Sequence, residues 1–169
     1  APNDCAANPD EVIKPRTLSH LVYFVPDVAK AEAFYARLGF VVTDRFNHLG
    51  PFMRPAGTQD HHTLFMIERQ NEHMVGCNHF TFHLGSANEV LQHGWEFVRK
   101  GYKSFWGPGR HILGSNYFWY FNSPFGAVME IDADMDLHDD RWVPRECDPG
   151  KDNSQIFLFH AAPKWAPGE

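Results

Sequence analysis

The sequence predicts an α+β fold in which two βαβββ modules pair into a cupped, mostly antiparallel sheet with the helices outside. Two observations support this prediction. The order of a strand, a helix and further strands occurs twice along the chain, and a histidine falls at the equivalent place in the first strand of each half, at His20 and His79. Such internal repetition indicates two structural units of one kind, each burying its apolar face against the other.

The first module covers about residues 17–70. Asp27 is placed to cap a helix whose apolar residues recur with a helical period, and Gly39 is suited to end it. In the strand before that helix, His20 shares one face with the apolar residues two and four positions later. The expected elements are a strand at 18–25, a helix at 28–38, a strand at 40–46, a loop with room for a short strand at 47–61, and a strand at 62–67.

The second module covers about residues 77–133. Ser86 is placed to cap its helix and Gly101 to end it. A Ser-Pro-Phe-Gly stretch at 123–126 is typical of a tight turn between two strands. The expected elements are a strand at 78–84, a helix from 87 to about 100, an extended segment at 102–106, a turn at 107–109, and strands at 117–121 and 127–132.

The remaining segments give weaker signals. The polar arm at 1–16 is expected to be unstructured, and the tail at 134–169 is rich in Pro and Asp. The tail has one apolar run, at 156–159, to which the sequence assigns no place in the fold.

Composition narrows the class of protein. A net charge of −6, spread along the chain, argues against a nucleic-acid surface and against an anionic membrane face. No apolar run approaches the roughly 18 residues of a membrane span, and the first ten residues lack the order of a signal peptide. Three cysteines without a CxxC pair are typical of free thiols in a reducing compartment. We therefore expect a cytoplasmic protein.

The two equivalent histidines suggest a metal site. If the modules pair, His20 and His79 face each other across the cup, and Glu130 on the last strand can face the same space. Two histidines and one carboxylate on one side of an ion form the facial triad of non-haem Fe(II) sites. A lone strand histidine is more often a core or surface residue, and only the repeat favours a ligand role here. His83 shares a face with His79, but about 13 Å separates them along the strand, so we interpret His83 as structural.

The stretch from His111 to Glu130 resembles the signature of type I extradiol ring-cleavage dioxygenases, which belong to the vicinal oxygen chelate (glyoxalase/dioxygenase) superfamily. Trp119 replaces an aliphatic residue or Phe, and Ser123 stands before the signature Pro; both departures are mild. The spacing of His111, Tyr120 and Glu130 is intact. His-His-Thr-Leu at 61–64 and Asn-His-Phe at 78–80 also resemble family stretches, and the resemblance covers roughly 18–132.

This resemblance implies a function and a set of roles. It implies a single catalytic domain over 1–169, of the one-domain form, that opens a catecholic ring beside its hydroxylated carbons using dioxygen. It implies Fe(II), less often Mn(II), held by His20, His79 and Glu130. His62 would exchange protons with the substrate and oxygen, and His111 and Tyr120 would hydrogen-bond their oxygen atoms. By analogy we also expect a homo-oligomer.

Two alternatives stay open. A glyoxalase-like isomerase or epimerase of the same fold usually adds a further carboxylate ligand from the first module, for which Glu68 is the candidate. A ligand-binding protein of the fold would need no metal triad. The sequence does not distinguish simple catechols from biaryl or fused-ring diols.

Overall fold

A ten-stranded sheet organises the computed structural model, which describes residues 13–150 and 153–159. The order of its strands is β10-β6-β7-β8-β5-β1-β4-β3-β2-β9. The first twelve residues of the expected N-terminal arm, and parts of the tail, lie outside the described residues.

The two modules have the same topology. In the first, β1 pairs with β4 in parallel, and β4, β3 and β2 follow as antiparallel neighbours. In the second, β5 pairs with β8 in parallel, and β8, β7 and β6 follow as antiparallel neighbours. The elements are β1 (Thr17–Val25), α1 (Val28–Arg37), β2 (Phe40–Phe46), β3 (Gly50–Pro55) and β4 (Leu64–Glu68), then β5 (Cys77–His83), α2 (Ala87–Arg99), β6 (Ser104–His111), β7 (Tyr117–Asn122) and β8 (Val128–Ala133). The predicted fold class is confirmed.

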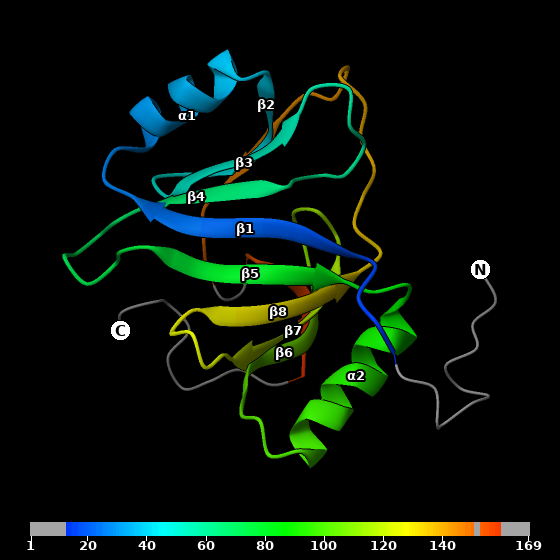
Figure 1. Ribbon diagram of the computed structural model, residues 1–169. Helices are drawn as coiled ribbons and strands as arrows, with labels where there is room; N and C mark the ends of the chain where they lie inside the picture. The colour runs from blue at the N-terminus through cyan, green and yellow to red at the C-terminus, as the bar shows by residue number, and fades with distance from the viewer. Residues whose placement is uncertain (1–12, 151–152, 160–169) are drawn as a thin grey trace.

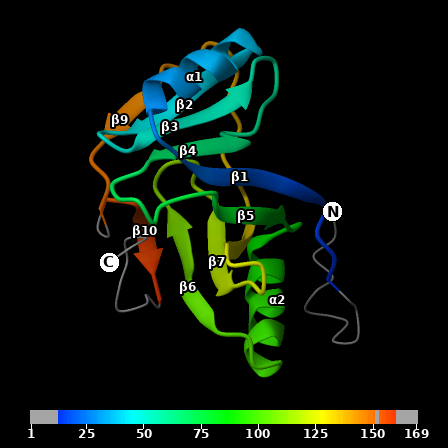
Figure 2. The ribbon, with the colours of Figure 1, turned by 60° about the vertical axis from the view of Figure 1, so that its left-hand side comes forward.

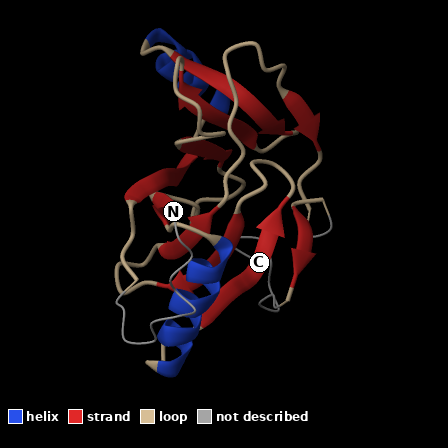
Figure 3. Ribbon diagram, turned by 90° about the vertical axis from the view of Figure 1, so that its right-hand side faces the viewer, coloured by secondary structure: helices blue, strands red, loops and turns tan. Residues whose placement is uncertain are grey.

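The modules join where the first strand of one lies antiparallel to the first strand of the other, β1 beside β5, in the centre of the sheet (Figure 1). The helices lie toward opposite ends of the molecule (Figure 3), where α1 packs on β2 and β4, and α2 packs on β6, β7 and β8. Asp27 and Ser86 accept hydrogen bonds from the backbone N–H groups of the first turns of α1 and α2. The predicted caps are therefore formed as expected.

The described residues form three apolar clusters. One lies under α1 and one under α2, so each helix covers the outer face of its own module. The third belongs mainly to the first module and consists of Val22, Phe46, Phe52, Phe65, Ile67, Met74 and Leu113. Burial of apolar side chains such as these is the dominant favourable contribution to folding.

The turn predicted at 107–109 is wrong, because β6 runs through it without a break. A register shift against β7, between Trp106 and Gly109, accommodates Pro108, which cannot donate a ladder hydrogen bond. The glycines serve close approach instead of a turn. A Cβ at Gly109 would lie 2.6 Å from the Phe118 ring, and one at Gly107 would lie 3.0 Å from the backbone oxygen of Phe118.

Two further boundaries differ from the expectation. The strand predicted at 62–67 begins only at Leu64, so His62 stands in the bend before β4. The backbone N–H of His61 donates to Asp136 of the tail, whereas Thr63 is the first residue of this segment to donate to β3. The loop at 47–61 contains the full strand β3.

The tail adds a strand to each edge of the sheet. β9 (Arg145–Cys147) lies parallel to β2, and β10 (Gln155–Leu158) lies antiparallel to β6 (Figure 2). The apolar run at 156–159 is thus mostly an edge strand, and both strands cover hydrogen-bonding edges that would otherwise be open. Among the described residues, neither helix has the length and apolar composition of a membrane span.

Candidate active site

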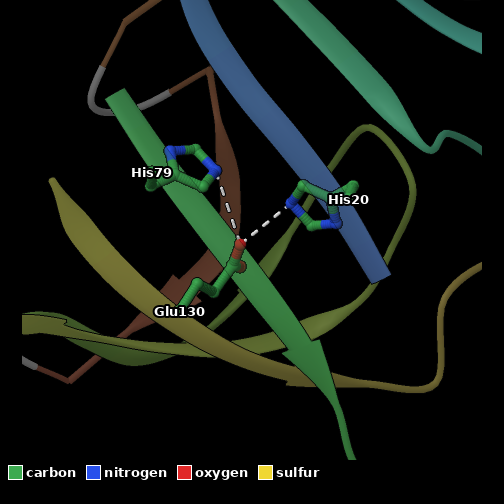
Figure 4. A group of neighbouring side chains, drawn as sticks. All are labelled: His20, His79 and Glu130. Atoms are coloured by element: carbon green, nitrogen blue, oxygen red, sulfur yellow. Dashed lines mark ion pairs between the residues drawn. The ribbon is translucent and has the colours of Figure 1, made fainter. Parts of the chain in front are cut away.

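The three predicted metal ligands converge at the centre of the cup. His20 comes from β1, His79 from β5 and Glu130 from β8, and both rings point at the carboxylate (Figure 4). The Nε2 atoms of His20 and His79 lie 3.0 and 3.5 Å from Oε2 of Glu130. One ligand atom from each residue lies within 4.8 Å of the others. Such a spacing allows three donors to contact one ion.

The charge states of these groups fit a cation. Burial lowers the pKa of His79 to about 3, so that ring is neutral near pH 7. Burial alone would raise the pKa of Glu130, but the field of His20 and hydrogen bonding hold it well below its usual range. Oε1 of Glu130 is buried without a hydrogen-bond partner. A neutral imidazole, an ionised carboxylate and an unsatisfied oxygen are what a divalent ion requires.

Neighbouring polar groups orient the triad. The amide oxygen of Asn78 lies 2.6 Å from Nδ1 of His79, so this nitrogen donates and Nε2 keeps its lone pair toward Glu130. Ser19 lies 3.2 Å from Nδ1 of His20. Thr81 lies 2.8 Å from Nε2 of His20 and donates to Glu130 at 2.6 Å.

Sequence reasoning missed these three orienting residues. Each was accessible from simple patterns: Ser19 and Asn78 directly precede the two histidines, and Thr81 shares the inward face of β5 with His79. The repeat of a small polar residue before each histidine is a signal that could have found the first two.

The three residues predicted to act on substrate line the same cavity as His20 and His79. Glu130, which contacts both of these histidines, is itself fully buried. His62 is 4% exposed, and its ring centroid lies 4.3 Å from that of His20. Nε2 of His111 lies 3.2 Å from the hydroxyl of Tyr120 and 3.6 Å from Oε1 of Glu130. Burial and the Glu130 carboxylate raise the pKa of Tyr120, which keeps its hydroxyl protonated as a donor. The structure thus brings all six predicted residues together.

The cavity has a volume of about 440 Å³ and is largely walled by apolar side chains. Most of that wall comes from the first module, where the Phe52 and Phe65 rings stack with centroids 4.1 Å apart. The second module contributes Trp106, which stacks on Tyr120 with ring centroids 5.2 Å apart. Aromatic side chains from both modules therefore line the cavity close to the polar cluster, which suits a flat apolar ligand.

The strand register reveals how the two modules differ at the site. Val22 of β1 pairs with Phe65 of β4, and its counterpart Thr81 of β5 pairs with Glu130 of β8. Phe65 therefore occupies the first-module position that Glu130 occupies in the second. The first module has a phenyl ring where a second carboxylate ligand would stand.

The two other candidate residues lie apart from the triad. Glu68, at the end of β4, accepts a hydrogen bond from the backbone N–H of Val28 at the start of α1, and it does not line the cavity. His83 donates to Asp132 at 2.8 Å, and this hydrogen bond raises its pKa. Neither belongs to the group of potential ligands formed by the described residues.

Residues 17–131 match the family model described as the Glyoxalase/Bleomycin resistance protein/Dioxygenase superfamily. The chain is 37% identical over 125 residues to metapyrocatechase 2 from Cupriavidus necator, and the match covers 73% of this chain but only 38% of that protein.

Solved structures of similar fold include a glyoxalase and a dioxygenase. The fold is similar to the Mn(II)-bound glyoxalase from Novosphingobium aromaticivorans, with a TM-score of 0.80, 25% identity, and coverage of 92% of this chain and 50% of that one. It is also similar to 2,2',3-trihydroxybiphenyl 1,2-dioxygenase from Sphingomonas wittichii, with a TM-score of 0.74, 23% identity, and coverage of 86% and 50%. The chain spans about half the length of these structures. The family match, together with the paired βαβββ modules, shows that this chain belongs to the glyoxalase/bleomycin resistance protein/dioxygenase superfamily.

Proposed function

We propose that this protein is a metal-dependent extradiol dioxygenase that cleaves a catecholic ring with dioxygen. The observation that carries the proposal is the convergence of His20, His79 and Glu130, two of which line one aromatic-walled cavity together with three further polar side chains. The similarity to metapyrocatechase 2 over most of the chain supports it. We further propose that the metal is Fe(II), with Mn(II) as the alternative, and that His20, His79 and Glu130 hold it.

The chain's own residues suit the roles proposed for them. A divalent ion at the triad would supply Lewis acidity and open coordination positions. Burial lowers the pKa of His62 well below its usual range, so its imidazole is a neutral acceptor for a substrate proton. Tyr120 and His111 lie together beside Glu130, where they can hydrogen-bond substrate oxygens. The Phe52 and Phe65 faces would hold the ring and exclude water.

A glyoxalase-like isomerase is the second candidate, because a Mn(II)-bound glyoxalase is among the most similar structures. The side chains favour the dioxygenase. The expected extra ligand Glu68 is engaged with α1, and Phe65 stands at the counterpart of Glu130. Three protein ligands leave more open positions for a diol and oxygen than four would.

The test is to reconstitute the protein anaerobically with Fe(II) and then supply a panel of catechols that includes alkyl and aryl substituents. We expect catechol-dependent oxygen uptake and a new yellow chromophore. Bound metal without oxygen uptake on any catechol, but with turnover of a glutathione-type hemithioacetal, would favour the isomerase. Absence of metal binding would refute both enzymatic proposals.

A further inference from the structure

A buried hydrogen-bond chain leads away from His62 on the side opposite the cavity. Nδ1 of His62 lies 2.8 Å from Nδ1 of His61, and Nε2 of His61 lies 2.8 Å from Oδ2 of Asp44. His61 and Asp44 are both 0% exposed. Arg145, from the tail strand β9, closes the chain: its Nη2 lies 2.6 Å from Oδ2 of Asp44, and its backbone N–H donates to Oδ1 at 2.8 Å.

The proton positions along these hydrogen bonds follow from the charge state of Asp44, at the end distant from His62. Burial alone would raise the pKa of Asp44, but hydrogen bonds from His61 and Arg145 hold it far below its usual range. The ionised carboxylate only accepts, so Nε2 of His61 carries a proton. Burial lowers the pKa of His61, so that ring is neutral and its Nδ1 has a lone pair. At 2.8 Å, Nδ1 of His62 must donate to it, whether His62 itself is neutral or charged.

Neighbouring rings and backbone pack against the two histidine rings. Phe52 lies against His61 and His62, with ring centroids 5.5 and 5.0 Å away. On the other side, the backbone at Gly114 approaches so closely that a Cβ there would lie 3.0 Å from Nδ1 of His61. The His138 ring, from the tail, lies 5.2 Å from the His61 ring. These contacts support the ring orientations in which the two Nδ1 atoms face each other.

We propose that Asp44 and His61 are positioning residues for His62, which hold its proton on Nδ1 and leave Nε2 as the nitrogen that exchanges protons within the cavity. The arrangement of hydrogen bonds from Asp44 through His61 to His62 stands on the structure alone. Its effect on turnover rests on the proposed dioxygenase function. The tail takes part through Arg145, so an edge strand outside both modules helps to set the state of a residue at the centre of the cup.

The first test needs neither metal nor substrate. Histidine ¹⁵N NMR on the metal-free wild-type protein should show His62 with a protonated Nδ1 and a pyridine-type Nε2. It should also show a coupling through the hydrogen bond between the two Nδ1 atoms. A His62 ring protonated only on Nε2 would overturn the proposal, and this measurement depends on no variant that has to fold.

The second test reverses the direction of the hydrogen bonds between residue 44, His61 and His62. In Asp44→Asn, the side-chain oxygen can still accept from Arg145 while the amide donates to Nε2 of His61. Both rings should then change tautomer, and His62 should carry its proton on Nε2. Asp140→Asn is the matched control, because it weakens another ion pair between the tail and the first module, with Arg54, without touching His61. An unchanged His62 tautomer in Asp44→Asn would contradict the proposal.

Kinetics on the Fe(II)-loaded protein separate this proposal from the proposed function. We expect Asp44→Asn to bind metal normally and to lower kcat about 100-fold, as loss of general acid–base catalysis does. Asp140→Asn and the conservative Asp44→Glu should retain more of the wild-type kcat than Asp44→Asn. If no catechol is cleaved even by the wild type, the dioxygenase proposal fails. The NMR result then still decides whether Asp44 and His61 hold the His62 proton on Nδ1. If kcat in Asp44→Asn equals wild type despite a changed tautomer, the positioning role is refuted.

Discussion

In the second module, β8 places a buried carboxylate, Glu130, against the cavity-lining His20 and His79. In the first module, β4 places a phenyl ring, Phe65, at the equivalent position. The same difference recurs two residues further along these strands, where Asp132 corresponds to Ile67. The two modules thus share one topology but contribute different side chains to the site. The second contributes Glu130, His79, His111 and Tyr120, and the first provides His20, His62 and the larger part of the apolar wall.

The comparison shows how a duplicated fold can make an asymmetric site. Because β1 and β5 are adjacent and antiparallel, their equivalent histidines meet, with ring centroids 5.6 Å apart. A second carboxylate at position 65 would add a fourth protein ligand. With an apolar ring there, the proposed ion would have three protein ligands and keep open positions for a ligand.

The largest effect is expected for Glu130→Ala, which removes the only carboxylate among the potential ligands of the described residues. Metal content after reconstitution, measured by mass spectrometry of the metal, should fall to a trace. Glu68→Ala is the matched control, because it removes a carboxylate from the first module's parallel strand and should leave metal content unchanged. Loss of metal in the Glu68 variant, but not in the Glu130 variant, would show that the carboxylate ligand comes from the first module and would contradict our proposal.

Phe65→Glu would make the two modules alike at the site. We expect ring cleavage to be lost while metal binding persists, because the added carboxylate would occupy a position needed by substrate. Loss of the buried ring should also lower the free energy of unfolding by about 3 kcal/mol or more. Oxygen uptake and chemical denaturation measure the two effects. Phe65→Leu should retain cleavage, and equal activity of the Glu variant would show that the position is not decisive.

His62→Phe should preserve metal content and slow ring cleavage by about 100- to 10,000-fold, the usual range for a general acid or base. The check is oxygen uptake on metal-matched samples. Turnover at the wild-type rate would refute the proton role of this first-module residue.

The buried carboxylate of Asp44 should link the stability of the fold to pH. Asp44 has a lowered pKa in the fold, so its stabilisation is present above the unfolded value near 4 and is lost as pH falls below it. The difference in unfolding free energy between wild type and Asp44→Asn should therefore shrink by up to about 2 kcal/mol between pH 6 and pH 3. A difference that does not change with pH would show that Asp44 is not ionised in the fold.

The smallest effect concerns the helices. α2 lies so close to the sheet that a Cβ at Gly94 would meet the Trp119 ring at 2.1 Å, whereas α1 has no buried residue. Gly94→Ala should therefore destabilise the protein by about 1 kcal/mol or more, although alanine is the better helix former. Thermal unfolding measures this, and a higher melting temperature would contradict the packing.

Repetition made most of the fold predictable. Both helices, their caps and the first strand of each module follow from local patterns, since each has its own capping residue or apolar period. The grouping of His20 with His79 followed from their equivalent places in the repeat. The turn predicted at 107–109 failed because glycine and proline there serve close contact with Phe118 and a bulge, which local sequence does not distinguish from a turn.

Other features depend on tertiary contacts that no local pattern carries. β9 and β10 have only three and four residues, and each becomes a strand because an edge of the sheet is available. The chain from Asp44 through His61 to His62 joins residues 17 positions apart and is closed by Arg145, a further 101 positions from Asp44. Its members are ordinary polar residues in sequence, and only the fold assembles them.

The central claim is that one metal ion sits between the modules, held by His20 from the first and by His79 and Glu130 from the second. Anomalous scattering at the iron edge, from crystals of Fe(II)-reconstituted protein, tests it most directly. Our account predicts one strong peak within bonding distance of Nε2 of both histidines and of the Glu130 carboxylate. A peak at Glu68 or elsewhere, with none at the triad, would contradict it.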